Sequence, residues 1–387
     1  MIYADHNATS PLDPLVWDAM RPFFTERFHN PASPYTPARA AALAITSARE
    51  RVAELVDCAP EEIIFTSGGT ESNTTAIHLA RAWNPDRRHW ICSAVEHASV
   101  LEPLAALERE GHRVSHIPVD RSGRIDLAAL DAALTEDTAL VCVMSANNET
   151  GIVHPIDEIA ARAHARGVPV HVDAVQSVGR VPLSVRALGV DLLTCCAHKM
   201  HGPKGAGALV VRAGRSVGPL IRGGGQEQGR RAGTENVPAL VGFGAAAARA
   251  RMLLEAEGPR VRALRDQVEA DIRGALPDVV VVGADVARLP NTTLFLVPGL
   301  HTDVLLARLD LADICCSSGS ACASGSAEPS HVLKAMGWGG DSAPAALRVS
   351  WGRFSTEAEA NILVSALVNG VSEVLRAKHG SACSKKF

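Results

Sequence analysis

The stretch EIIFTSGGTESNTTAIHLARAW (62–83) contains the pattern from which the fold can be predicted. Its first six residues form a β-rich run, and after the turn SGGT the apolar residues take helical spacing. The same alternation recurs along the chain, with further strands expected at 89–93, 113–119, 139–145 and 168–174. It predicts an α/β fold in which helices cover both faces of a mostly parallel sheet.

Two more strands are expected in DLLTCCAHKM (191–200) and GAGALVVR (205–212), which gives a sheet of seven strands. After about residue 255 a long helical pattern leads into the β-rich runs VVVVG, NTTLFLV and LRVSWGR. We therefore predict a large domain (15–254) and a smaller α+β domain formed by 1–14 and 255–387.

The composition excludes several classes of protein. A chain of 387 residues with 47% hydrophobic and 21% charged residues is typical of a globular protein. Its net charge of -4 and the lack of a long basic run argue against nucleic acid or an anionic membrane as partner. We find no secretion signal and expect no membrane-spanning segment. The nine cysteines are not spaced as a disulfide framework or a zinc site, so we expect a cytoplasmic protein without a metal of its own.

Ligands of open α/β sheets bind beyond the carboxyl ends of the strands, so the loops that follow strands are informative. Gly69 and Thr70 lie in a glycine-rich turn before a helix, which suits a phosphate, although a plain tight turn has the same composition. The chain has no GxxxxGK[ST] motif and no GxGxxG after the strand, which argues against nucleotide and dinucleotide sites.

Two later loops add the groups that pyridoxal phosphate (PLP) needs. Asp173 ends an apolar strand, where a buried carboxylate requires a cationic or hydrogen-bonding partner. Lys199 follows another strand and is a candidate Schiff-base lysine, with a surface lysine as the alternative. His97 is either a ligand contact or a structural cap, and Asn148 lies in a polar turn that suits either role. Together with the Gly69 turn, this set indicates PLP but not the reaction.

Cys322 indicates the reaction. It lies in SSGSACASGS (317–326), where serine, glycine and alanine cannot build a core and favour an exposed, mobile loop. An exposed thiol is normally a redox liability, so a functional thiol is the better interpretation. A cysteine that moves between a cofactor and the protein surface suits sulfur relay.

At this point the sequence resembles a known family, the cysteine desulfurases of the NifS/IscS type. These are fold-type I PLP enzymes of aminotransferase class V. The resemblance extends essentially from end to end and is closest to the nitrogen-fixation branch. It includes the phrases YADHNATSPLDP, FTSGGTESN, VEHASVL, NNETGIVHPI, HVDAVQSVG, AHKMHGPKGAGAL, GGGQEQGRRAGTENV, SSGSACASGSAEPSHVLKAMG and LRVSWGRFSTEAE.

The resemblance implies roles for the residues that surround the cofactor ring. Lys199 holds the cofactor as a Schiff base and moves the Cα proton of the substrate. Asp173 pairs with the pyridinium nitrogen, and Gln176 bonds the phenolic oxygen. His97 stacks on the ring and takes part in proton transfer.

The resemblance also implies how the phosphate and the substrate are held. Gly69, Thr70, Cys196 and His198 contact the phosphate, and Thr234 reaches the phosphate of a neighbouring subunit in a homodimer. Asn148 and Arg348 hold the carboxylate of L-cysteine, for which a bidentate arginine is well suited.

The activity implied is conversion of L-cysteine to L-alanine, with the sulfur carried on Cys322 as a persulfide. The cysteine loop (about 315–328) would deliver that sulfur to an iron–sulfur cluster scaffold protein, with Cys322 contacting a cluster iron during transfer.

Some positions depart from the family pattern. Cys196 replaces a phosphate-binding serine, and a thiol is a weaker donor. Gln228 replaces an arginine and removes a positive charge. Ala323 follows the cysteine where threonine is common, and we expect little effect from that change. The short tail carries another cysteine, Cys383, and this puts the docking of the scaffold in doubt.

Two alternatives remain. A selenocysteine lyase, or another class V PLP enzyme, could use the same residues, although an aminotransferase needs no loop thiol. A non-catalytic sulfur carrier would need neither Lys199 nor Asp173.

Overall fold

The computed structural model describes residues 1–319, 330–339 and 344–383. A seven-stranded sheet forms its centre, with the strand order β2-β8-β7-β6-β5-β3-β4. Its strands are β2 (Ile63–Thr66), β3 (His89–Ser93), β4 (Arg113–Ile117), β5 (Thr138–Met144), β6 (Val170–Asp173), β7 (Leu192–Cys196) and β8 (Gly207–Val211). Only β8 runs antiparallel to its neighbours, β7 and β2. The predicted mostly parallel sheet is therefore confirmed.

Several predicted strands are longer than the observed ones: the run 168–174 forms a strand only at Val170–Asp173, and the run 113–119 shows a physical reason. The run 113–119 was expected as a strand, but β4 ends at Ile117. Pro118 follows, and a proline has no N–H group for the ladder. Val119 instead forms a separate bridge to Ile125.

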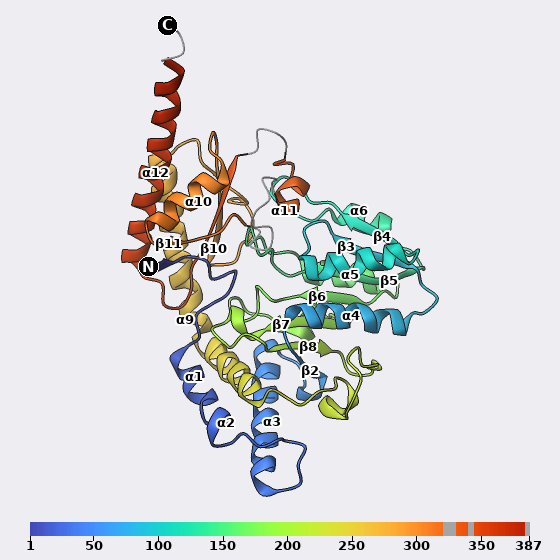
Figure 1. Cartoon of the computed structure of the whole chain (residues 1–387). Helices are drawn as coiled ribbons and strands as arrows, with labels where there is room; N and C mark the ends of the chain where they lie inside the picture. The colour runs from blue at the N-terminus through green and yellow to red at the C-terminus, as the bar shows by residue number, and fades with distance from the viewer. Residues whose placement is uncertain (320–329, 340–343, 384–387) are drawn as a thin grey trace.

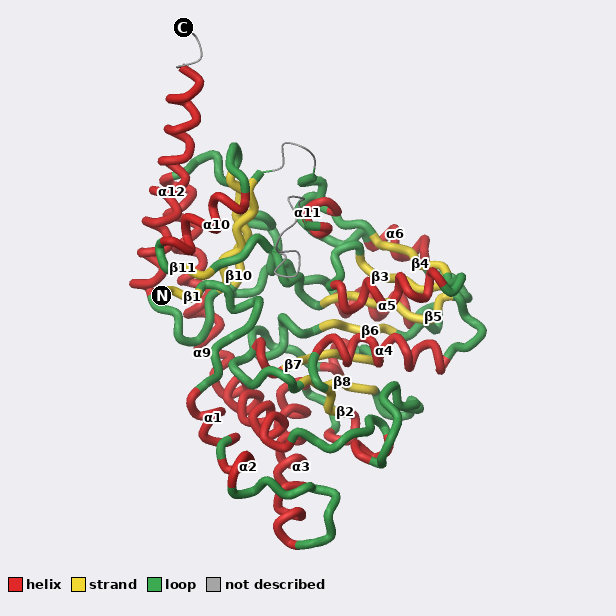
Figure 2. Tube along the Cα trace, viewed as in Figure 1, coloured by secondary structure: helices red, strands yellow, loops and turns green. Residues whose placement is uncertain are grey.

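Helices cover both faces of the sheet, because successive side chains of a strand point to opposite sides. Along β3, Trp90 and Cys92 pack in one apolar cluster, whereas Ile91 packs in another. The first cluster includes side chains of α4 (Gly69–Trp83) and α5 (Ala98–Arg109), and the second includes side chains of α3 (Thr36–Val56), α7 (Ile156–His164) and α9 (Val237–Ala275). Figure 2 shows the strands side by side with helices around them.

Two smaller sheets lie apart from the central one (Figure 1). Strands β12 (Ala345–Ser350), β10 (Thr292–Val297) and β9 (Val280–Val281) form an antiparallel sheet, and β1 (Ile2–Tyr3) pairs with β11 (Ile314–Cys315). A third apolar cluster joins them to α10 (Thr302–Leu311) and α12 (Glu357–Cys383). The first residues of the chain thus pair with a strand of its C-terminal part.

Helix α9 links the two regions. Phe243 in its first half packs in the core of the central sheet, and Leu264 in its second half packs with the smaller sheets. The predicted domain boundary at 254/255 falls within this helix, and the division into domains stays a proposal. Shorter elements complete the chain: α1 (Pro14–Met20), α2 (Pro22–Thr25), α6 (Leu127–Ala133), α8 (Val185–Leu188), α11 (His331–Ala335), η1 (Pro60–Glu62), η2 (Ala197–Lys199) and η3 (Gln226–Gly229).

Helix α9 also differs from one expectation. No membrane-spanning segment was expected from the sequence, yet α9 is long and apolar enough to cross a membrane by length and composition. Half of its most apolar window is buried within the fold, and core helices pass the same test. The finding is therefore weak evidence for a membrane span.

Candidate active site

Asp173 ends one strand and Lys199 follows the parallel strand beside it, so both residues lie at the same edge of the sheet. Asp173 is the last residue of β6, and Lys199 lies in the turn η2 directly after β7. The Asp173 carboxylate is buried and accepts hydrogen bonds from the Val175 amide (3.0 Å) and from Asn73 Nδ2 (2.8 Å). A buried carboxylate held this way can pair with a cationic ring nitrogen.

The Lys199 amine points at the N-terminal segment of the chain. Its Nζ donates to the carbonyl oxygens of Asn7 (2.5 Å) and Ala8 (2.7 Å). Burial is the main cause that lowers the pKa of Lys199 to about 8. A larger fraction of the amine is therefore uncharged near neutral pH than in a free lysine, and only the uncharged amine is a nucleophile.

This lowered pKa predicts the pH dependence of Lys199 reactivity. In the cofactor-free enzyme, we expect acetylation of Lys199 by trace acetic anhydride to rise with pH to a midpoint of about 8. Between that value and 10.5, where an ordinary lysine titrates, Lys199 is mostly uncharged and a free lysine is mostly charged. Peptide mass spectrometry measures the labelling, with free lysine as internal standard. A midpoint near 10.5 would contradict the prediction.

Arg180 fixes the N-terminal segment over this edge and was missed from the sequence. Its guanidinium donates to Gln176 Oε1 (2.5 Å), to Asn7 Oδ1 (2.8 Å) and to the carbonyl of His6 (3.0 Å). Gln176 Nε2 in turn donates to the carbonyl of Asn7 (3.1 Å). Burial lowers the pKa of Arg180 to about 10, so the side chain stays charged at neutral pH. The polar residues of YADHNATS were the available signal.

The candidate phosphate site lies at the start of α4. Gly69 and Thr70 are in the first turn of this helix, where backbone N–H groups have no acceptor within the helix. A Cβ atom on Gly69 would lie 3.0 Å from Val175 Cγ2, and one on Gly207 would lie 2.6 Å from the Cα atom of Gly68. Glycines therefore let this turn lie close against the neighbouring strand ends.

His198 and Cys196 shortly precede Lys199 in the chain, and both side chains are neutral. Burial lowers the pKa of His198 to about 4, and its Nδ1 is 3.1 Å from Thr9 Oγ1. Burial also raises the pKa of the Cys196 thiol to about 11, which keeps the sulfur protonated. Cys196 can thus offer an anion only a weak S–H donor.

Arg348 and Asn148 meet on the side of the smaller antiparallel sheet. Arg348 lies on β12 and is 1% exposed. Its Nη1 donates to the carbonyls of Asn148 (3.0 Å) and Gly319 (2.7 Å), and its Nη2 pairs with Asp5 (2.6 Å). Its buried Nε–H has no partner within the part of the chain that the structure describes. This donor is therefore available to a substrate carboxylate.

Glu149 was missed from the sequence and lies beside Gly319, which borders the cysteine loop. The carboxyl group is buried, and burial raises its pKa. A Cβ atom on Gly319 would lie 2.9 Å from Glu149 Oε2 and would push this carboxylate aside, and the φ of +102° also favours glycine. Cys322 and Ala323 lie outside the described residues.

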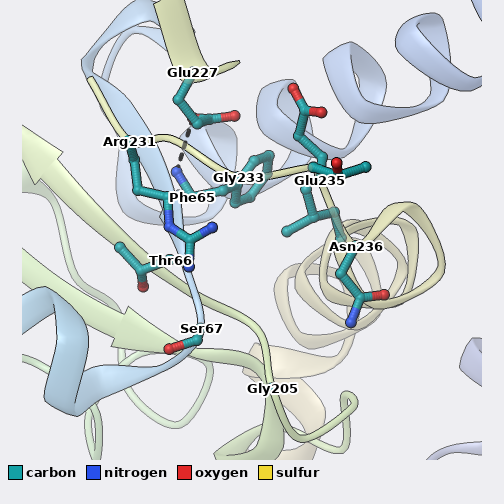
Figure 3. Close-up of a pocket in the computed structure, with 11 residues that line it drawn as sticks. Phe65, Thr66, Ser67, Gly205, Glu227, Arg231, Gly233, Glu235 and Asn236 are labelled. Carbon is teal, nitrogen blue, oxygen red and sulfur yellow. Dashed lines mark hydrogen bonds between the residues drawn. The ribbon is translucent and has the colours of Figure 1, made fainter. Parts of the chain in front are cut away.

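Thr234 lines a separate cavity beside β2. Arg231, Glu227 and Glu235 line the same cavity and are labelled in Figure 3. Glu227 has a φ of +48°, pairs with Arg49 (2.6 Å) and accepts from the Phe65 amide (2.9 Å). The next residue, Gln228, has a φ of +60°. The exposed Thr234 side chain remains a proposal as a contact to a second copy of the chain.

These residues fit pyridoxal phosphate. A buried carboxylate, a half-buried amine of lowered pKa and a helix start without a side-chain cap lie at one sheet edge. These are the groups that the ring nitrogen, the aldehyde and the phosphate of the cofactor require. In the described part of the chain, no group of three or more His, Cys, Asp or Glu residues is placed to hold a metal ion.

Comparison with known proteins agrees with this geometry. The family described as Aminotransferase class-V matches residues 2–363. The chain belongs to this family. It is 46% identical to "Cysteine desulfurase 2" of Trichormus variabilis, over 97% of this chain and 94% of that protein. It is 44% identical to "Cysteine desulfurase NifS" of Azotobacter vinelandii, over 92% and 89% of the two chains.

Solved structures of family members show the same fold. A "NIFS-LIKE PROTEIN" superimposes with a TM-score of 0.90 at 34% identity, covering 96% of this chain and 99% of that one. The structure titled "SspA in complex with cysteine" gives a TM-score of 0.80 at 34% identity, over 92% and 100% of the chains. The predicted fold type and the predicted cysteine desulfurase activity are confirmed.

Proposed function

We propose that the chain transfers the sulfur of L-cysteine to Cys322 as a persulfide, leaves L-alanine, and delivers the sulfur to an iron–sulfur cluster scaffold protein. One arrangement carries the proposal. Arg348 Nε–H has no partner among the residues that the structure describes and can bind a carboxylate, and the same guanidinium holds the carbonyl of Gly319. Gly319 is three positions from Cys322 in the sequence, so the substrate anchor and the border of the cysteine loop share one residue.

The residues at the sheet edge would hold the cofactor. Lys199 would bind its aldehyde carbon, Asp173 would pair with the ring nitrogen, and the remaining contacts are assigned as the sequence implied. These are Gln176 at the phenolic oxygen, His97 against the ring, and Gly69, Thr70, Cys196 and His198 at the phosphate. Thr234 would reach the phosphate held by a second copy of the chain, which makes the protein a homodimer.

Bound pyridoxal phosphate supplies an electron sink that stabilises negative charge at Cα and weakens the bond between Cβ and sulfur. Lys199, as the free amine, takes the Cα proton. The Cys322 thiolate attacks the substrate sulfur, so an S–S bond forms while the C–S bond breaks. The electron pair of that bond stays with the carbon skeleton, which takes up protons and leaves as alanine.

The persulfide would then pass to a thiol of the acceptor, with Cys322 contacting a cluster iron during transfer. Likeness to the Azotobacter vinelandii relative supports an acceptor in nitrogen-fixation cluster assembly. The seven cysteines whose side chains the structure describes are free, which supports a reducing compartment such as the cytoplasm.

The overall reaction is tested by product balance. With L-cysteine and a thiol reductant, the purified holoenzyme should release alanine and sulfide in equal amounts. Pyruvate and ammonia in place of alanine would contradict the proposal. A parallel assay with selenocysteine tests the alternative, because a selenocysteine lyase should strongly prefer that substrate.

A conservative change at Arg348 should affect substrate binding. We expect Arg348→Lys to raise the KM for L-cysteine about 10- to 100-fold with a smaller change in kcat, because lysine has no planar pair of donors. Sulfide release at varied L-cysteine measures both constants. Arg353→Lys is the control, since Arg353 pairs with Asp13 and Glu257 instead. Unchanged KM in Arg348→Lys would show that this arginine does not hold the substrate.

A further inference from the structure

We propose that Ser99, whose hydroxyl is oriented by Asn73, is a positioning residue that fixes His97 as a neutral hydrogen-bond donor through Nε2, chiefly by its backbone amide, so that His97 does not act as the base. This inference rests on the proposed function, because it concerns the role of His97 in the proposed reaction with L-cysteine. It narrows the role that the sequence resemblance implied, because proton removal from the substrate is then left to Lys199.

The first observation concerns the start of α5. His97 is the N-cap residue of this helix, and its Nδ1 accepts a hydrogen bond from the backbone N–H of Ser99 at 3.1 Å. A backbone amide can only donate, so Nδ1 must present a lone pair. In the neutral ring, the single proton is therefore on Nε2. This nitrogen has no hydrogen-bond partner among the residues described, and it remains available to a ligand.

The second observation is a chain of hydrogen bonds that begins at Asn73. Its Nδ2 donates to Asp173 Oδ2 (2.8 Å) and to Ser99 Oγ (2.8 Å). Since Ser99 Oγ accepts from Asn73, its own hydrogen is free to point at His97 Nδ1, which lies 2.8 Å away. Nδ1 thus faces two donors, and one amide group holds both the Asp173 carboxylate and the Ser99 hydroxyl.

Protonation of His97 would oppose this arrangement. A proton on Nδ1 would face the Ser99 N–H and hydroxyl, so the helix cap would have to break. Burial and the charged groups around the ring also affect the pKa of His97. Burial lowers the pKa of His97, Lys199 and His331 lower it further, and Asp173 opposes them. A neutral ring whose only free nitrogen carries a proton cannot accept another, so it donates a hydrogen bond instead.

One substitution can remove both donors. Ser99 is the second residue of α5, and Ser99→Pro deletes its amide hydrogen together with its hydroxyl. The chain already has proline at the second position of α3 and α9, namely Pro37 and Pro238, so a helix start tolerates it. Ser99→Ala is the matched control, because it removes the hydroxyl and keeps the amide. Ser99→Ala should fold, so it and the wild type still test the inference if Ser99→Pro does not fold.

The readout is nitrogen NMR of the holoenzyme labelled with 15N-histidine, with His97→Gln used to assign the signals. In the wild type and in Ser99→Ala, we expect an unprotonated Nδ1 and a protonated Nε2 that do not change between about pH 6 and pH 8. Ser99→Pro should show tautomer exchange, and its pH–rate profile should gain a histidine limb. A proton on Nδ1, or titration of His97 with a pKa near 6.5, in the wild type would overturn the inference. These signals do not depend on turnover, so failure of the proposed reaction is seen separately, as the loss of alanine and sulfide.

Discussion

Lys199→Ala should lower the rate of sulfide release from L-cysteine by about 10³-fold or more, the scale expected when the only base at a reacting carbon is removed. The variant should also lose the cofactor absorbance band that depends on covalent attachment to lysine. The physical reason is that Lys199 combines a half-buried amine of lowered pKa with a position at the same edge of the sheet as Asp173. Sulfide assay and absorbance spectroscopy measure the two effects.

Lys204→Ala is the matched control for this variant. Lys204 is five positions away and exposed. Its loss should therefore leave the absorbance spectrum unchanged and the rate of sulfide release within about twofold of the wild-type rate. If Lys199→Ala kept wild-type activity, or if Lys204→Ala lost it, the assignment of the Schiff-base lysine would be wrong.

Cys322→Ala should separate cofactor chemistry from sulfur transfer. We expect the variant to bind pyridoxal phosphate and to show a spectral change with L-cysteine, because Lys199, Asp173 and Arg348 are intact. Alanine and sulfide should both fall by about three orders of magnitude, as expected when a nucleophile is removed. Rapid-scan absorbance and product analysis on the same samples measure the two halves of the prediction.

Cys383→Ala provides the comparison, since it removes a thiol from the C-terminal tail and should leave alanine formation unchanged. Wild-type product formation by Cys322→Ala would contradict the proposed role of the loop cysteine. Loss of the spectral response to L-cysteine would instead indicate damage to the cofactor site.

The central sheet could be predicted because all of its strands except the edge strand β4 are buried on both faces. Continuous apolar runs such as that of β5 have few other stable arrangements. The same logic located Asp173 and Lys199, because the carboxyl ends of parallel strands meet at one edge. The extent of α9 was harder to predict, since it carries one apolar face for the central sheet and another for the smaller sheets.

The residues that support the site were harder to find. Asn73, Ser99 and Glu149 act through contacts to residues far away in the sequence or through the backbone, as in the bonds of Asn73 to Asp173 and Ser99. No local pattern predicts such partners. Arg180 was also missed, because a half-buried arginine looks in the sequence like any surface arginine until its acceptors are known.

The most direct test of the account is to locate the transferred sulfur. Wild-type holoenzyme would be exposed briefly to L-cysteine without reductant, alkylated, digested and analysed by peptide mass spectrometry. The account predicts that the peptide containing Cys322 gains the mass of one sulfur atom, in step with alanine release, while the peptide containing Cys383 does not. Alanine release without added sulfur on Cys322, or with sulfur on another cysteine, would contradict it.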